Sequence, residues 1–199
     1  MMLVEQTTVP AAALPIAEFK DHLRMGTGFA DDALQDAVLE SYLRSAMAAI
    51  ESRTGKILIA RQFMWSLTAW RSLQKQAFPV APVGQITGFR MRDRAGAVSE
   101  IASARYALQK DDHRPYLLAV GGNLPDIAIG GAAEVVFEAG FGAAWTDLPA
   151  DIAHAVLLLA AHFYENRDLA GAGQAAMPYG VTSLIERYRT VRILGGVSA

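Results

Sequence analysis

The feature that most constrains this chain is a run of residues, 148–167, that is apolar on nearly every side of the helix it predicts. Asp147, Pro149 and Asp151 are start signals of that helix, because proline suits the first turn and acidic groups favour the positive end of the helix dipole. One face carries Ile152, Val156, Leu159 and Phe163, and a second carries Ala153, Leu157, Ala160 and Tyr164. Such a helix must be covered by its own domain or by a neighbouring subunit. Because the run is shorter than the roughly 20 apolar residues of a membrane span, we expect a central buried helix in a soluble protein, with no membrane partner.

The composition narrows the class of protein further. The chain has 199 residues, of which 52% are hydrophobic and 19% are charged, so it can bury a sizeable core. Its formal net charge of −2 argues against a protein that binds nucleic acid by neutralising many phosphates. The absence of cysteine excludes disulfides and thiolate metal sites and fits synthesis in a reducing cytoplasm. The first fifteen residues lack the pattern of a signal peptide, so we expect no export.

Helical periodicity occurs in four segments, and alternation with a period of two occurs between the second and the third. The predicted helices cover residues 15–25, 31–54, 148–167 and 178–189. The predicted strands cover residues 62–70, 86–92, 97–101, 106–110, 116–120 and 134–139. Short strands joined by tight turns favour an antiparallel arrangement. We therefore predict an α+β fold, a small bundle of about four helices with an antiparallel β-domain inserted between the second and third helices. The boundaries near 56 and 146 give a helical domain of residues 1–56 and 146–199 and an inserted β-domain of residues 57–145.

Several local expectations accompany this fold. Residues 1–13 read as an extended arm, Pro79 and Pro82 mark a loop, and residues 170–176 read as a flexible link. The final helix has capping-box spacing between Ser183 and Glu186. In the helix at 31–54, one predicted stripe consists of Leu34, Val38, Tyr42, Ala46 and Ile50, flanked by Leu39, Leu43 and Met47.

Two polar clusters are candidates for chemistry, and both have a simpler structural explanation. His162, Glu165 and Asn166 lie within one helical turn, but no second helix supplies the further ligands of a metal site, so they are expected to be hydrogen-bonding groups at a helix end. Asp111, Asp112 and His113 lie between two predicted strands, which favours a solvated turn over an acid–base set. No P-loop, dinucleotide fingerprint, nucleophile elbow or zinc-protease motif is present. We expect a protein that is not an enzyme, with no catalytic residue, metal or cofactor.

The carboxyl-terminal segment mixes basic and apolar residues. Arg187, Arg189 and Arg192 are interleaved with Tyr188, Val191, Ile193 and Leu194. One interpretation is a frayed, solvated terminus. The other is a docking arm that pairs with the sheet edge of a partner, where backbone hydrogen bonds give affinity and alternate side chains give specificity.

Several segments together resemble a known family. They are VVFEAGFG at 135–142, the helix at 148–168, MPYGVTSLIERYR at 177–189, and the helical segments at 14–25 and 31–55. Their order is similar to that of the head–tail connector proteins of tailed phages, also called adaptor or head-completion proteins, in the long form with a β insertion. That form is also found in gene transfer agents, which are phage-like particles. The most specific parts of the resemblance are HFYENRD and MPYGV…YR, and the β insertion matches less distinctly.

The resemblance implies a structural role in a virion or phage-like particle. Members of this family form a ring, commonly of twelve subunits, beneath the portal protein at the head–tail interface. The ring extends the channel through which double-stranded DNA passes without sequence-specific binding, and it docks the next neck protein, a stopper or a tail terminator. The carboxyl-terminal segment commonly engages the portal, which here implies portal docking by Tyr188, Arg189, Val191, Arg192, Ile193 and Leu194. The residues expected to pack the central helix against the bundle or a neighbouring subunit are Ile152, Val156, Leu159, Phe163 and Tyr164.

Two alternatives stay open on the sequence. The chain could be a small-molecule enzyme or binding domain with a pocket in the β block and His113 or His162 in the chemistry. It could also be a different neck or tail-completion protein of a phage-like particle. The sequence does not distinguish a phage from a gene transfer agent.

Overall fold

The computed structural model describes residues 1–25, 33–166 and 177–189. The helices in this part of the chain are α1 (Ile16–His22), α2 (Ala33–Thr54), α3 (Ala150–Glu165) and α4 (Tyr179–Ile185). The strands are β1 (Met2–Glu5), β2 (Arg61–Leu67), β3 (Lys75–Ala77), β4 (Val83–Arg92), β5 (Val98–Glu100), β6 (Tyr106–Gln109), β7 (Tyr116–Ala119) and β8 (Ala132–Ala139). Every pairing between these strands is antiparallel. The predicted α+β class, with a β block between the second and third helices, is confirmed.

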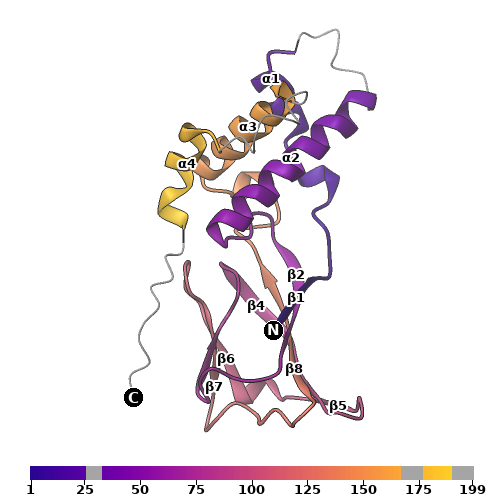
Figure 1. Cartoon of the computed structure of the whole chain (residues 1–199), viewed down its shortest axis with the longest axis vertical. Helices are drawn as coiled ribbons and strands as arrows, with labels where there is room; N and C mark the ends of the chain where they lie inside the picture. The colour runs from indigo at the N-terminus through magenta and orange to yellow at the C-terminus, as the bar shows by residue number, and fades with distance from the viewer. Residues whose placement is uncertain (26–32, 167–176, 190–199) are drawn as a thin grey trace.

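The helices and the sheets occupy opposite ends of the molecule (Figure 1). Helix α3 lies between α2 and α4 and contacts both, while α1 packs against α2 and α3. The core of the helical end is formed by the inward faces of these helices together with Leu58, Ile59 and Trp145 from the segments that enter and leave the β block. The predicted packing of α3 on the long helix and on the final helix is therefore present within one chain.

The buried stripe of α2 differs from the predicted one. Leu39, Leu43, Ala46, Met47 and Ile50 are buried, whereas Val38 is 47% exposed and Tyr42 is only half-buried. The helix turns 100° per residue, so a row of residues spaced by four drifts about 40° at each step and winds out of the core. From Val38 onward, the predicted row therefore passes from the outer face to the core, which it reaches at Ala46 and Ile50.

The larger sheet has five strands in the order β1-β2-β8-β4-β5. Its edge strand β1 lies within residues 1–13, which were predicted to be an extended arm. Met2–Glu5 pair with β2 in register from Met2 and Ser66 to Glu5 and Phe63, a strand pairing that the sequence did not predict. The predicted boundaries assigned residues 1–56 to the helical domain. The sheet thus includes a strand from outside the predicted insertion, and the division into a helical domain and an inserted β-domain stays a prediction.

The smaller sheet has three strands in the order β3-β7-β6 and faces the larger sheet across a second apolar core. Strand β3 was missed, since residues 70–78 carry no alternation long enough to predict a strand. Trp65 is fully buried, and its ring lies 5.3 Å from that of Phe78, which in turn lies 4.8 Å from Phe137. These aromatic contacts join the two sheets.

Two glycines of the EAGFG segment allow the chain to cross itself between the two cores. A Cβ at Gly140 would lie 2.4 Å from the backbone of Ala60, and its φ of +141° is unfavourable for other residues. A Cβ at Gly142 would lie 2.3 Å from the side chain of Asp147. The amide of Ala60 donates to the carbonyl of Gly142 at 2.7 Å, which fixes the exit of β8 against the entry to β2. The role of these glycines is thus close backbone packing.

Helices α3 and α4 begin within two residues of their predicted starts. Pro149 and Pro178 occupy their N-cap positions, and Ser183 lies inside α4, so the capping-box prediction is wrong. A 3-10 turn, Trp145–Asp147, precedes α3, and another, Glu186–Tyr188, follows α4. The predicted link at 170–176 and the helix-starting residues Asp31 and Asp32 lie outside the described residues.

Candidate functional site

The end of the described chain is anchored to the start of α3. The Tyr188 hydroxyl donates to Asp151 Oδ1 at 2.8 Å, and Arg187 Nε lies 2.9 Å from Asp151 Oδ2. The Tyr188 ring meets Phe141 edge-on, with 6.2 Å between centroids, and only 9% of the residue is exposed. Burial raises the pKa of Tyr188, and the Asp151 carboxylate adds to this rise while Arg187 opposes it. The hydroxyl therefore stays a neutral hydrogen-bond donor, and the segment leaves the bundle from a fixed point.

This anchor divides the predicted docking residues into two groups. Tyr188 is part of the core of the single chain, whereas Arg189 is exposed and pairs with Glu186 at 2.9 Å. The other predicted docking residues, Val191, Arg192, Ile193 and Leu194, lie outside the described residues. Portal docking by this segment stays a prediction, in which Tyr188 holds the segment in place.

The residues predicted to pack α3 differ in burial. Ile152, Val156 and Leu159 are buried, while Phe163 and Tyr164 are half-buried. Tyr164 meets Tyr42 of α2 edge-on at 5.8 Å between ring centroids. The remaining face includes half-buried Leu157 and Leu158 and exposed His154, so the single chain does not cover α3 on every side.

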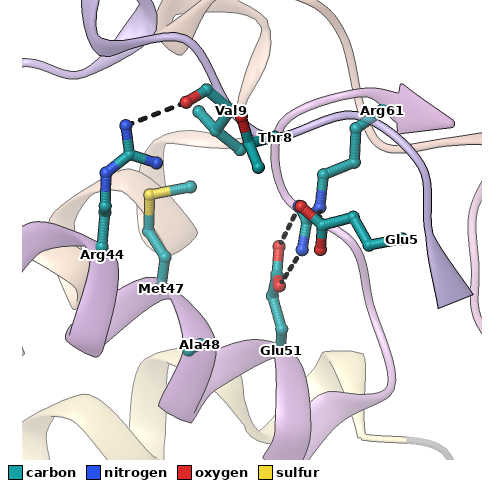
Figure 2. A pocket seen from close by; sticks show the side chains of 8 residues that line it. All are labelled: Glu5, Thr8, Val9, Arg44, Met47, Ala48, Glu51 and Arg61. Atoms are coloured by element: carbon teal, nitrogen blue, oxygen red, sulfur yellow. Dashed lines mark hydrogen bonds and ion pairs between the residues drawn. The ribbon is translucent and has the colours of Figure 1, made fainter.

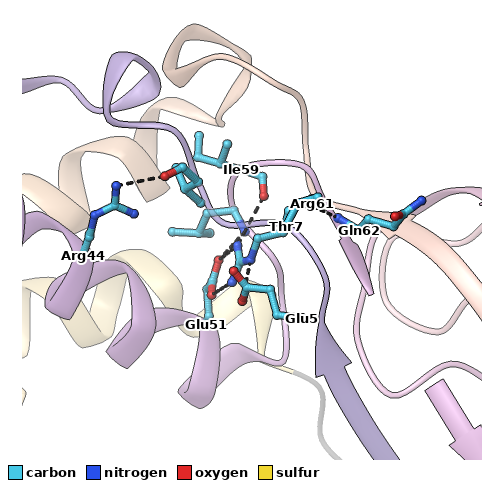
Figure 3. Close-up of polar contacts among 9 residues, drawn as sticks. Glu5, Thr7, Arg44, Glu51, Ile59, Arg61 and Gln62 are labelled. Carbon is cyan, nitrogen blue, oxygen red and sulfur yellow. Dashed lines mark hydrogen bonds and ion pairs between the residues drawn. The ribbon is translucent and has the colours of Figure 1, made fainter. Parts of the chain in front are cut away.

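A buried ion-pair network joins the helical end to the larger sheet (Figure 3). The guanidinium of Arg61, at the start of β2, donates to both carboxylate oxygens of Glu51 in α2, at 2.9 and 2.7 Å. Its Nε lies 2.9 Å from Glu5 Oε2 of β1. Burial alone would lower the pKa of Arg61, but the hydrogen bonds and charges of Glu51 and Glu5 outweigh it and raise the pKa. Glu51 also accepts a hydrogen bond from the Leu58 amide at 2.8 Å, so one carboxylate joins α2 to two points on the stretch of chain that leads into β2.

A cavity of about 140 Å³ opens beside this network (Figure 2). Its lining residues are Glu5, Thr8, Val9, Arg44, Met47, Ala48, Glu51 and Arg61. Arg44 donates to the carbonyl of Val9 at 2.9 Å, which holds the N-terminal arm against α2 on the far side of the cavity. Sequence reasoning missed this site, because its charged members are separated in the chain and no motif connects them.

The first polar cluster proposed from the sequence lies at the end of α3. The Asn166 amide groups donate to the His162 carbonyl, at 3.1 Å from the backbone and 2.8 Å from the side chain, and the Asn166 side-chain nitrogen lies 3.1 Å from His162 Nδ1, while Glu165 is exposed. The predicted hydrogen-bonding role at the helix end is confirmed for His162 and Asn166 and stays a prediction for Glu165. Among the residues that the structure describes, no three His, Asp or Glu side chains are grouped to hold a metal ion.

The turn at residues 111–114 is held by its own aspartate. Asp111 Oδ1 accepts hydrogen bonds from the amides of His113 and Arg114, at 2.8 and 2.6 Å, and these bonds lower the pKa of the Asp111 carboxyl. A cavity of about 180 Å³ in the β block lies elsewhere, between the β4–β5 hairpin and the loop around Asp126. Neither His113 nor His162 lines it, so the geometry does not support a histidine-based pocket there.

Lys56 connects this turn to the end of α2. The residue is 1% exposed. Its ammonium group donates a hydrogen bond to the Asp112 carbonyl and lies 3.3 Å from His113 Nδ1. Burial lowers the pKa of Lys56, and the charges of Asp112 and Asp111 offset this only in part. The only sequence signal for such burial is the apolar run ILIA that directly follows this lysine.

We expect Lys56→Met to change how stability depends on pH. In the unfolded chain the lysine pKa is about 10.4, so between the lowered folded pKa and that value the unfolded state binds more protons. The free energy of unfolding should therefore rise with pH over this alkaline interval, and Lys56→Met should lose that rise. Urea unfolding at about pH 8 and about pH 10 measures it. Lys110→Met, at an exposed position, is the control, and equal slopes for all three proteins would contradict the prediction.

No described helix is both long enough and apolar enough to cross a bilayer. No protein-family model and no curated protein matches the chain. Solved structures do match it over nearly its whole length. A chain in the neck of an empty gene transfer agent (GTA) particle, computed with C6 symmetry, is 55% identical, with a TM-score of 0.89. A chain in the virion of a native GTA particle is 56% identical, with a TM-score of 0.86. A chain in the neck of a native GTA particle, computed with C12 symmetry, is 52% identical, with a TM-score of 0.84.

Each of these alignments covers 98% of this chain and 99% of the matched chain. The similarity therefore covers the β insertion as well as both flanking helical segments. In the sequence, the β insertion was the part that resembled the family less distinctly. At more than half identical residues over the full length, the relation is one of homology and not of fold alone. The chain belongs to the family of structural proteins found in the neck of gene transfer agent particles.

Proposed function

We propose that this chain is the head–tail adaptor of a gene transfer agent or related phage-like particle, joining the portal protein to the next neck component. The observation that carries the proposal is the full-length similarity to chains of GTA necks. The protein acts as a structural component at the head–tail interface, made in the bacterial cytoplasm, and it catalyses no reaction and needs no cofactor. The two-ended shape suits this role, because the helical end and the β end present different surfaces along the long axis (Figure 1).

The adaptor works as a ring of identical subunits, with twelve as the proposed number. The necks that contain the similar chains were computed with C12 and C6 symmetry, both of which are compatible with a ring of twelve. A closed ring needs head-to-tail contacts between two different faces of each subunit. Helix α3 is incompletely covered in the single chain, where half-buried Leu157 and Leu158 provide apolar surface for such contacts beside exposed His154.

The ring also encloses the path of double-stranded DNA. Each phosphate that a lysine or arginine neutralises adds salt-dependent affinity, which would slow the passage of DNA. A formal net charge of −2 keeps such binding weak. The proposed partners are thus the portal protein, a tail-side stopper or tail terminator, further copies of this chain, and DNA bound without sequence specificity.

Electron microscopy of particles tests the position of the protein. A tagged chain co-produced with its particle genes should appear as a ring directly beneath the portal. A ring found further along the neck would instead support the role of another neck or tail-completion protein. Absence of the tag from the neck would contradict the proposal altogether.

Deleting residues 190–199 should weaken attachment to the portal and leave the fold intact. The bundle keeps its anchor, since Tyr188 and its bond to Asp151 precede the deletion. We expect an unchanged thermal midpoint and fewer tailed particles in electron micrographs. A full-length variant with residues 191–194 each replaced by serine separates the effect of these side chains from that of chain length. Normal tail attachment in both variants would remove the docking-arm proposal.

A further inference from the structure

The first observation is an aromatic side chain that the single chain leaves in solvent. Tyr179, the first residue of α4, is 87% exposed. It follows Pro178, which occupies the N-cap position, and precedes Gly180, whose added Cβ would meet no atom within 4 Å. Large aromatic residues tend to anchor protein interfaces, since they bury much area with little loss of side-chain entropy. Tyr179 therefore has the exposure and the surroundings of an interface anchor.

The second observation is the cavity between α2 and the N-terminal arm. Its volume, about 140 Å³, is close to the roughly 150 Å³ of an engineered cavity that binds benzene, but that cavity is lined by apolar residues, whereas four of the eight residues lining this one are charged. Val9, Met47 and Ala48 provide apolar walls, and Glu5 and Thr8 provide oxygen atoms that can accept a hydrogen bond from a phenol (Figure 2). The cavity is thus large enough for one aromatic ring and chemically suited to tyrosine.

Polar contacts join the walls of the cavity, and an uncharged strip of α2 continues from its rim. The bond from Arg44 to the Val9 carbonyl and the pairing of Arg61 with Glu51 fix its two sides. Ala48 at its rim continues into an exposed strip of α2 formed by Ala37, Val38, Ser41, Ser45 and Ser52. A helix surface without charge is easily dehydrated by a packed neighbour, because no ionised group has to lose its water. Cavity and strip together form one flank of the helical bundle.

Tyr179 lies on the other flank. Helix α3 separates α4 from α2, and the N-terminal arm lies beyond α2 on the side away from α4 (Figure 1). Tyr179 is not among the residues that line the cavity of its own chain. In a ring, each subunit presents one flank to the opposite flank of the next. The arrangement of anchor and cavity on opposite flanks is the one that such a head-to-tail contact requires.

We infer that Tyr179 of one copy inserts into the cavity between α2 and the N-terminal arm of the next copy. The inference rests on the proposed ring and names the surfaces that form it. The phenol ring packs on Val9, Met47 and Ala48, and its hydroxyl donates to Glu5 or Thr8. The partner that fits this surface is a second copy of this chain.

Cysteine cross-linking tests the contact directly, because the natural chain has no cysteine. Gly180→Cys places a thiol beside Tyr179 without removing it, and Ala48→Cys places one at the rim of the cavity. The two substitutions are combined in one chain, incorporated into particles and treated with a short bismaleimide. A contact that repeats around the ring should yield a ladder of covalent oligomers beyond the dimer on a denaturing gel. Chains with either cysteine alone should yield none of these larger species.

The controls separate this inference from the proposed function. A chain with Ala48→Cys and Leu73→Cys carries its second thiol in the β block, where Leu73 is 53% exposed, and should give no ladder. A ladder from this control pair, or none from the test pair in necks that contain the protein, would overturn the inference and leave the proposed function standing. If the natural chain, without any added cysteine, is absent from the neck, both the inference and the proposed function are wrong. Tyr179→Ala should also lower the amount of protein in the neck, and Tyr179→Phe should keep most of it.

Discussion

Replacing Arg61 by methionine should lower the free energy of unfolding by about 3–5 kcal/mol, the usual cost of removing one partner of a buried ion pair. The Arg61 and Glu51 side chains are 9% and 11% exposed, so methionine would leave the Glu51 carboxylate buried without its counter-charge. The loss would affect both ends of the molecule, because Glu51 belongs to α2 and Arg61 to β2. Urea unfolding of the purified chain at neutral pH measures it.

Two matched variants show whether the buried charge is the cause. Arg53→Met replaces an exposed arginine in the last turn of α2 and should change the free energy of unfolding by less than about 0.5 kcal/mol. The double variant Arg61→Met, Glu51→Met removes both charges and should recover much of the stability, since paired buried charges can be replaced by apolar groups at little cost. A double variant as unstable as the single one would show that the network acts through shape and not through charge.

Shortening Leu159 to alanine should cost about 2–5 kcal/mol of unfolding free energy, the range found for leucine-to-alanine changes that leave a cavity. Leu159 is 1% exposed and lies in the middle of α3, where the core of the helical end surrounds it. The close packing around it, including fully buried Ile152 and Val156, leaves little room for collapse into the vacated space. Thermal and urea unfolding both report the change.

Leu158 is the matched control, because it has the same chemistry, the same helix and the neighbouring position. It is only half-buried, so Leu158→Ala should cost clearly less stability than Leu159→Ala. If the half-buried face of α3 meets a neighbouring subunit, Leu158→Ala should instead reduce incorporation of the protein into necks. Equal losses of stability for the two variants would contradict the assignment of the inner and outer faces of α3.

Hydrophobic periodicity predicted the larger elements of the fold correctly. The runs at 31–54 and 148–167 became α2 and α3, and the alternating segments became β2, β4 and β8 within a few residues. Long periodic segments are predictable because their pattern repeats over several turns or residue pairs. The two strands that were missed, β1 and β3, have four and three residues. Strands β5, β6 and β7 are equally short, but turn residues separate them from one another, and those turn signals made them predictable.

The candidate sites were less predictable than the fold. The absence of catalytic motifs and the mixed basic and apolar end of the chain were visible in the sequence, and they directed attention to assembly. The Arg61 network and the adjoining cavity were not visible, since they combine β1, α2 and the start of β2. Arg61 and Glu51 are ten residues apart and Glu5 is much further away, so only the folded chain brings these charges together.

The sequence by itself determined the class of the fold and the order of helices and strands, because these follow from local periodicity and turn residues, and its resemblance to a known family implied the structural role. The tertiary structure alone decided which helix faces are buried, that the N-terminal segment completes the larger sheet, and where the charges of Arg61 and Lys56 are neutralised or buried. Those features depend on contacts between segments distant in the chain. Local patterns cannot encode such contacts, since the same apolar helix is stable against its own bundle or against a neighbouring subunit.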